Sequence, residues 1–218
     1  EKGLSVSVGD EGGFAPNLKT SEEVLDLIIL SIERAGLIYL DDISIALDCA
    51  ASELFCEDSY KLTGENKKFS SDEMIVYMQS LVDKYEIKSV EDPFDEKDWD
   101  AWKTFTKNNN DLQIVGDDIF VTQEKILRKG IESKVANSIL VKLNQVGTLS
   151  ETMQAISLAK NNGYKTIISH RSGETEDSFI ADLAVAVDAG QIKAGAPARS
   201  DRTAKYNRLL IIEDELYP

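Results

Sequence analysis

Six short apolar runs in this chain each end on a charged residue or run directly into one. The charged positions are Asp48, Glu91, Asp117, Lys142, His170 with Arg171, and Lys193. Carboxylates, ammonium groups, a guanidinium and the chain's one imidazole thus recur at equivalent places. Such groups can hold a metal ion, move a proton and bind an anion. The series predicts one site built from the ends of several elements.

The first three charged positions offer hard oxygen ligands. Asp48, Glu91 and Asp117 each follow a separate apolar run, and no matching set of Cys and His residues favours zinc. Oxygen ligands of this kind suit Mg²⁺, with Mn²⁺ as the other candidate. One acidic residue at such a place is more often a solvated carboxylate or a helix cap. The predicted metal site therefore depends on all three residues together.

Two residues are candidates for proton transfer. Lys142 ends the run 139–141, where burial and a nearby cation would both disfavour a charged ammonium, so it can act as a general base. A salt bridge to one of the carboxylates is the alternative. Glu11 lies in the glycine-flanked loop 9–13, which lets the backbone approach a ligand closely. A plain turn is the alternative there.

The last positions of the series are suited to an anion. Arg171 and Lys193 can clamp a carboxylate or a phosphate, and the hydroxyls of Ser169 and Ser172 add donors. His170 is either a hydrogen-bonded structural residue or a ligand contact. Metal, base, acid and cationic clamp together suit the removal of a proton next to a carboxylate, with assistance to a leaving group.

Parallel strands would bring these residues together. The apolar runs 43–47, 87–90, 112–115, 138–143, 166–169 and 191–192 predict buried strands, and the intervening segments predict helices near 21–35, 70–84, 96–107, 122–133, 148–162, 177–189 and 200–213. Strand followed by helix, repeated, predicts a parallel α/β sheet. In a barrel of such units the active site lies at the carboxyl ends of the strands.

Local motifs mark the helix ends and the start of the chain. Two segments, Ser70 to Glu73 and Thr148 to Glu151, fit the capping box. Four glycines are predicted as left-handed caps, namely Gly36, Gly130, Gly163 and Gly190. A further run at 4–8 gives seven predicted strands, whereas a closed barrel has eight. Because the chain also starts with Glu1, we expect an amino-terminal piece to lie outside this sequence.

Composition and charge exclude several classes of function. The net charge of −15 argues against nucleic acid and anionic membranes as partners. No apolar stretch is long enough to span a bilayer and no secretion signal opens the sequence, so we expect a cytoplasmic protein with Cys49 and Cys56 as reduced thiols. An anionic small-molecule ligand is compatible with the negative net charge, because a few cations in one pocket determine the local electrostatic potential.

Longer motifs around these residues resemble those of one family. They are the runs 8–17, 46–48, 52–53, 91–94, 116–118, 141–145, 169–177, 195–200 and 204–207. Together they resemble the carboxyl-terminal barrel of the enolases over essentially the whole chain. The run 169–177 is highly specific to that family.

The resemblance implies a fold and a reaction. The fold is a TIM-type (β/α) barrel of the enolase kind, incomplete at the amino terminus, with residues 1–218 as a partial barrel domain and the small α+β domain absent. The reaction is the reversible, Mg²⁺-dependent dehydration of 2-phosphoglycerate to phosphoenolpyruvate. Lys142 would remove the carbon-2 proton and Glu11 would protonate the leaving hydroxyl. Asp48, Glu91 and Asp117 would hold Mg²⁺, and substrate binding would involve Glu91, Asp117, Lys142, Ser169, His170, Arg171, Ser172 and Lys193.

The resemblance also implies partners, and it shows which residues of the family this sequence lacks. It implies a phosphorylated carboxylate as the small-molecule partner, a homodimer or octamer at full length, and a cytoplasmic location with a surface pool in some members. A mobile loop serine, a further histidine and a further glutamate of the family have no counterpart here, so we expect 218 residues alone to be inactive. Two other functions stay open: an acid-sugar dehydratase of the same superfamily and a noncatalytic binding or scaffold module.

Overall fold

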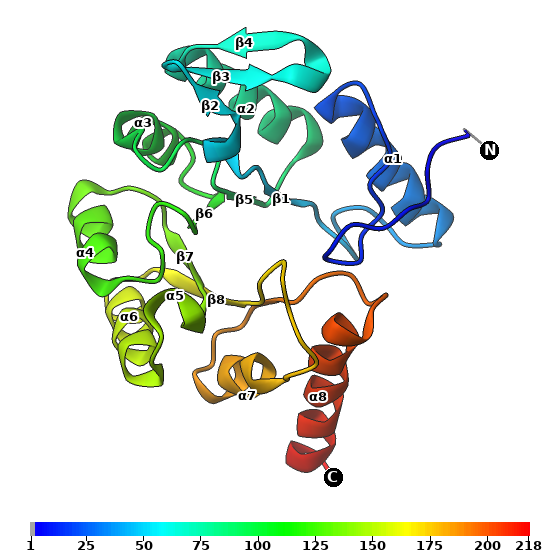
Figure 1. The fold of residues 1–218 in the computed structure, drawn as a ribbon, viewed down its shortest axis with the longest axis vertical. Helices are drawn as coiled ribbons and strands as arrows, with labels where there is room; N and C mark the ends of the chain where they lie inside the picture. The colour runs from blue at the N-terminus through cyan, green and yellow to red at the C-terminus, as the bar shows by residue number, and fades with distance from the viewer. Residues whose placement is uncertain (1–2) are drawn as a thin grey trace. The chain divides into compact units, whose positions relative to one another are not determined.

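The protein divides into two compact units, each with its own strands and helices. A computed structural model describes residues 3–218 (Figure 1), so Glu1 lies outside the described residues. The carboxylate unit comprises Leu18–Phe120 and Lys125–Ser138. The histidine unit comprises the described residues up to Asn17, together with Val121–Glu124 and Ile139–Pro218.

Three parallel strands form the main sheet of the carboxylate unit. They are β1 (Ala46–Asp48), β5 (Ser89–Glu91) and β6 (Gln113–Gly116), adjacent in that order. The register sets Asp48 beside Glu91, and Glu91 beside Val115. Residues inside β5 and β6, such as Val90 and Ile114, are fully buried. Consecutive residues of β6 are buried, so both faces of this strand are covered, as is typical of parallel sheets in α/β proteins.

The helices of this unit begin where the sequence supplies caps. They are α1 (Ser21–Arg34), α2 (Ser71–Tyr85), α3 (Trp99–Asn108) and α4 (Glu124–Ser133, in this unit from Lys125). Ser70 and Glu73 form the predicted capping box at the start of α2. Phe94 packs edge-on against the rings of Trp102 and Phe105, with centroids 6.2 and 5.4 Å apart. These aromatic contacts anchor α3 to the segment after β5.

A small antiparallel sheet, absent from the sequence prediction, also belongs to the carboxylate unit. It is formed by β2 (Phe55–Cys56), β3 (Ser59–Leu62) and β4 (Lys67–Phe69), flanked by the short 3₁₀ helices Ala51–Leu54 and Thr63–Glu65 (Figure 1). Glu57 and Asp58 form the first turn, both with positive φ. Two such residues make a tight hairpin turn, and a glycine-free turn is hard to recognise in a sequence.

The histidine unit repeats the alternation of strand and helix. Its strands are β7 (Ser138–Val141, joined to this unit from Ile139), β8 (Lys165–Ser169) and β9 (Ile192–Lys193), neighbours in that order. Its helices are α5 (Leu143–Val146), α6 (Leu149–Asn161), α7 (Phe179–Ala186) and α8 (Ser200–Leu216). The Thr148 hydroxyl caps α6 by accepting the Glu151 backbone N–H. The predicted strand 138–143 ends early because Leu143 already starts α5.

The predicted strand at residues 4–8 is wrong. Within the described residues of this segment, only Val8 makes a β-bridge, antiparallel to Phe14, and Val6 is 77% exposed. Alternating apolar residues form a strand only when a neighbour pairs with their backbone and covers one face. The described residues therefore contain six strands of the parallel pattern, where the sequence predicted seven.

Gly130 is also a correction, because it lies inside α4 and does not cap it. A Cβ at this position would lie 2.4 Å from Cε1 of Phe120, so glycine permits helix and ring to approach closely. The left-handed residue after α4 is Lys134, with a φ of 57°. Gly36, Gly163 and Gly190 do have positive φ, as predicted.

Other expectations concern membranes and thiols. Across residues 3–218, no helix combines the length and the apolar character that a membrane crossing requires. Cys49 and Cys56 are both free thiols, as predicted.

Candidate active site

The carboxylate unit presents the three predicted metal ligands at neighbouring strand ends. Asp48 and Glu91 are the last residues of β1 and β5, and Asp117 follows β6 directly. Glu91 and Asp117 are buried, whereas Asp48 is exposed and accepts the backbone N–H of Ala50 at 3.1 Å. Strand register thus sets three oxygen donors at one edge of this sheet.

A tighter acidic group shares one member with this set. The carboxylate oxygens of Asp92, Asp117 and Asp118 lie within 4.8 Å of one another. Neither Asp92 nor Asp118 is a metal-ligand candidate from the sequence alone. Because Asp92 directly follows Glu91, the sequence alone does not indicate which of these two acidic residues would bind a metal.

Asp92 fixes the turn that follows β6. It is 2% exposed, and its two oxygens accept the backbone N–H groups of Asp117 at 3.0 Å and Asp118 at 2.9 Å. Burial raises the pKa of Asp92 to about 7, although these two hydrogen bonds act to lower it. The carboxylate therefore holds the backbone that presents Asp117.

The donors of the carboxylate unit fit a hard divalent cation. Ionised carboxylates are costly to bury unless positive charge or hydrogen bonds compensate them, and Glu91 and Asp117 are both buried. Asp92, Asp117 and Asp118 offer carboxylate oxygens, which a divalent metal of the Mg²⁺ type prefers. A group of acidic residues able to bind a metal is therefore present, while Mg²⁺ itself stays a prediction.

In the histidine unit, three predicted site residues come together from distant parts of the sequence. His170 follows β8, and its Nε2 lies 3.3 Å from Oε2 of Glu11. The other Glu11 oxygen accepts the Ser172 hydroxyl at 3.0 Å. Glu11 is fixed through its backbone, because its carbonyl accepts the N–H of Ala196 at 2.8 Å. The candidate acid is thus placed beside the histidine loop.

His170 is held in a buried environment. The side chain is 2% exposed, and the backbone N–H donates to the carbonyl of Lys193 at 2.9 Å. Burial lowers the pKa of His170, with Arg202 and Lys193 acting in the same direction and the carboxylates of Glu11 and Glu174 acting against it. The neutral imidazole is therefore the favoured form.

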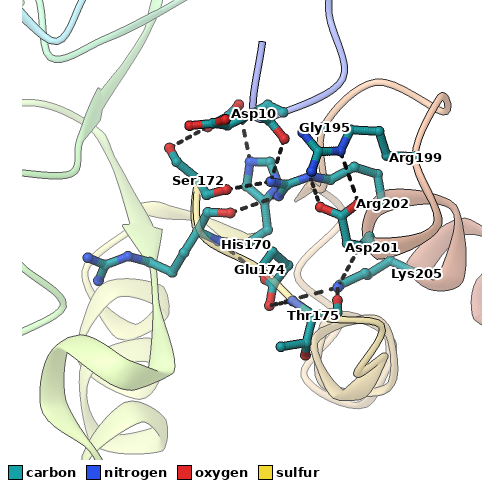
Figure 2. Close-up of polar contacts among 12 residues, drawn as sticks. Asp10, His170, Ser172, Glu174, Thr175, Gly195, Arg199, Asp201, Arg202 and Lys205 are labelled. Atoms are coloured by element: carbon teal, nitrogen blue, oxygen red, sulfur yellow. Dashed lines mark hydrogen bonds and ion pairs between the residues drawn. The ribbon is translucent and has the colours of Figure 1, made fainter. Parts of the chain in front are cut away.

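Two buried cations from α8 hold the loop after β8 (Figure 2). Arg202 is fully buried and donates to the carbonyls of Asp10 at 3.0 Å, Arg171 at 2.7 Å and Ser172 at 2.7 Å. Lys205, one turn further on and equally buried, donates to the carbonyl of Thr175. Neither residue is a site candidate from the sequence alone, because cations on a helix are normally expected to face solvent.

The remaining candidates also belong to the histidine unit. Lys142 precedes α5, and its backbone N–H donates to the buried Thr122 hydroxyl oxygen at 2.9 Å. The Arg171 guanidinium is exposed and donates to Oδ1 of Asn144 at 3.2 Å. The buried Ser169 hydroxyl donates to the carbonyl of His170 at 3.0 Å, and Lys193 ends β9 opposite Ser169.

Comparison with known proteins decides the family. The model of the enolase carboxyl-terminal TIM barrel domain matches residues 2–217. The chain belongs to the enolase family. The enolase of Natranaerobius thermophilus is 56% identical over 218 residues, which is 100% of this chain and 51% of that relative. The enolase of Legionella pneumophila strain Corby is 57% identical over 215 residues, 98% of this chain and 51% of that relative.

Two consequences follow from membership of the enolase family. The predicted family and the predicted TIM-barrel fold class, with its incomplete set of parallel strands, are confirmed. The chain spans about half the length of the curated enolases it matches. The activity of those whole proteins is therefore a matter for proposal.

Proposed function

We propose that residues 1–218 are a partial barrel domain of a phosphopyruvate hydratase. The reaction would be the reversible dehydration of 2-phosphoglycerate to phosphoenolpyruvate. The observation that carries the proposal is the meeting of Glu11, His170 and Ser172 within hydrogen-bonding or ion-pair distance. An acid beside donors suited to an anion is the arrangement that such a dehydration needs. With this function we expect a cytoplasmic protein that forms a homodimer or an octamer.

In this proposal, proton transfer belongs to Lys142 and Glu11. Lys142 would take the proton from carbon 2, from a backbone position that Thr122 fixes. Glu11 would give a proton to the departing hydroxyl at carbon 3. Its contact with the Ser172 hydroxyl orients the carboxyl group before substrate arrives.

Asp48, Glu91 and Asp117 would hold a divalent cation, with Mg²⁺ the expected metal. When bound, that cation stabilises the negative charge that develops on the substrate carboxylate. Asp92 would keep the backbone of Asp117 in place through its two accepted hydrogen bonds.

Cationic and hydroxyl groups of the histidine unit would bind the phosphorylated substrate. Arg171 and Ser172 would grip the phosphate, and His170, Lys193 and Ser169 would line the same pocket. A guanidinium and a hydroxyl together offer the charge-assisted donors that a phosphate needs.

The test is turnover by the full-length protein that carries these residues. Phosphoenolpyruvate formation from 2-phosphoglycerate with Mg²⁺ is followed by ultraviolet absorbance. Lys142→Met is expected to lower kcat by about 10²–10⁴-fold, the usual contribution of a general base. Lys129→Met is the matched control, because that ammonium lies over the Trp99 ring, 3.8 Å from its centroid, and has no proposed role.

Two results would contradict the proposed function. Unchanged kcat in Lys142→Met would remove the base from the mechanism. Preference for a sugar acid over 2-phosphoglycerate would favour the acid-sugar dehydratase. The 218-residue chain assayed alone is expected to be inactive, and clear turnover at its mass of 24.1 kDa would show that no further residues are needed.

A further inference from the structure

The two ring nitrogens of His170 face opposite kinds of group. Nδ1 lies in direct hydrogen-bond contact with a terminal nitrogen of the Arg202 guanidinium. Nε2 lies 3.3 Å from the carboxylate oxygen Oε2 of Glu11. Figure 2 shows the imidazole between the end of the buried arginine and the segment that carries Asp10.

The arginine contact selects one tautomer of the imidazole. A guanidinium only donates hydrogen bonds, and it stays protonated in proteins. Nδ1 of His170 must therefore accept, so the ring proton of the neutral imidazole sits on Nε2. That proton is directed toward the side of the ring where the Glu11 carboxylate lies. Protonation of Nδ1 would set two donors against each other.

The charges around His170 agree with this assignment. Arg202 from α8 and Lys193 from β9 disfavour a positive ring, whereas Glu11 from the loop 9–13 and Glu174 from the loop after β8 favour one. Of the two acidic groups, Glu11 lies on the Nε2 side of the ring, whereas the cation Arg202 lies on the Nδ1 side.

Arg202 can reach this position because its surroundings leave room for it. Gly195 has a φ of 85°, and a Cβ there would lie 2.7 Å from Cδ of Arg202 and 2.8 Å from the carbonyl oxygen of Glu11. The guanidinium also donates to three carbonyls, those of Asp10, Arg171 and Ser172, and its Nε lies 3.0 Å from Asp201. One side chain thus joins the Glu11 loop to the loop after β8.

We propose that Arg202 is a positioning residue that locks His170 as the Nε2–H tautomer and holds the Glu11 loop against the loop after β8. The use of that Nε2–H as a donor in dehydration rests on the proposed function. The tautomer itself does not, because it follows from the contacts of the chain alone.

The experiment is nuclear magnetic resonance of the 218-residue chain labelled with ¹⁵N-histidine. The sequence has one histidine, so the spectrum contains a single imidazole. Long-range ¹H–¹⁵N correlation identifies the protonated nitrogen, and titration gives the pH at which the ring becomes charged. In the wild type we expect a proton on Nε2 and a titration midpoint below that of an unperturbed histidine, about 6.5.

Arg202→Gln is the decisive variant. Without the guanidinium, Nδ1 can carry the proton, so we expect a mixture of tautomers and a titration midpoint at higher pH than in the wild type. Arg208→Gln is the matched control on the same helix. Arg208 pairs with Asp182 on another helix, so its loss changes helix packing and is expected to leave the imidazole spectrum unchanged.

Three results would overturn the proposal. They are an Nδ1–H tautomer in the wild type, a spectrum of Arg202→Gln identical to that of the wild type, and an equal change in Arg208→Gln. If Arg202→Gln does not fold, Arg202→Lys decides. A lysine keeps the charge but cannot serve the imidazole and three carbonyls together, so a weaker Nε2–H preference supports the proposal and an unchanged one opposes it.

Turnover of the full-length protein separates this proposal from the proposed function. An Nε2–H tautomer with no dehydration of 2-phosphoglycerate would contradict the proposed function and leave the role of Arg202 standing. Dehydration by a protein whose neutral His170 carries its proton on Nδ1 would contradict the role of Arg202 alone.

Discussion

In the carboxylate unit, Asp48 and Glu91 are themselves strand residues, and neighbouring strands align them in register. In the histidine unit, Glu11, His170 and Ser172 lie in loops, and side chains of another element hold those loops. Sheet hydrogen bonding aligns the first group, whereas a buried cation holds the loops of the second. Substitutions in the two units should therefore have different consequences.

Loss of a strand-end carboxylate is the largest expected effect. Glu91→Gln should weaken Mg²⁺ binding by about 100-fold or more, because removing a charged ligand exceeds the 10–100-fold loss seen for groups behind the ligands. Isothermal titration calorimetry of the full-length protein measures the affinity. Arg171→Gln in the histidine unit should leave it unchanged.

The matched control for this metal prediction is Glu96→Gln, since Glu96 is a partly exposed carboxylate of the same unit. Equal Mg²⁺ affinity in Glu91→Gln and Glu96→Gln would remove Glu91 from the ligand set. A strong effect of Arg171→Gln on metal affinity would break the proposed division between the units.

Close packing at two glycines gives the next largest effects. Gly130→Ala places a methyl group against the Phe120 ring, and overpacking of this kind costs about 1–3 kcal/mol of the free energy of unfolding. Gly195→Ala in the histidine unit meets Arg202 and the Glu11 backbone at positive φ, so it should cost more. Urea denaturation measures both.

Each glycine has a control in its own unit. Gly64 and Gly173 have open space where a Cβ would lie, so alanine should be tolerated at both. Gly195→Ala should also alter the His170 resonances, which Gly130→Ala should leave in place. Unchanged His170 resonances in Gly195→Ala, together with altered ones in Gly130→Ala, would show that His170 does not depend on the packing around Arg202.

Helix caps give the smallest expected effects, one in each unit. Ser70→Ala removes the hydroxyl that accepts the Glu73 backbone N–H at 3.3 Å, and Thr148→Ala removes a hydroxyl that accepts the Glu151 N–H at 3.2 Å. Each should cost about 1 kcal/mol of the free energy of unfolding. Chemical denaturation compares them with Ser80→Ala, an exposed position later in α2. An equal loss in Ser80→Ala would contradict the predicted effect of the caps.

The elements of both units could be predicted where local chemistry decides them. Buried apolar runs identified the strands that end at Glu91 and Lys193, and Ser70 identified the start of α2. The strand predicted for residues 4–8 is wrong, because an alternating pattern does not indicate whether a neighbouring strand exists to pair with the segment.

The supports of the site could not be predicted in the same way. Asp92 and Glu91 are adjacent acidic residues, and only the backbone shows that one accepts two N–H bonds. Arg202 and Lys205 lie on a predicted helix, but the sequence does not indicate which face of α8 is buried. Side chains that act through other side chains have no local pattern to identify them.

The two free thiols differ in a way that is useful for labelling. Burial raises the pKa of the Cys49 thiol, with the carboxylates of Asp48, Asp92 and Glu91 acting in the same direction, so little of the reactive thiolate is present at neutral pH. Cys56 is exposed at the β2–β3 hairpin. A maleimide dye should therefore attach at Cys56 and give the carboxylate unit an optical reporter of its own.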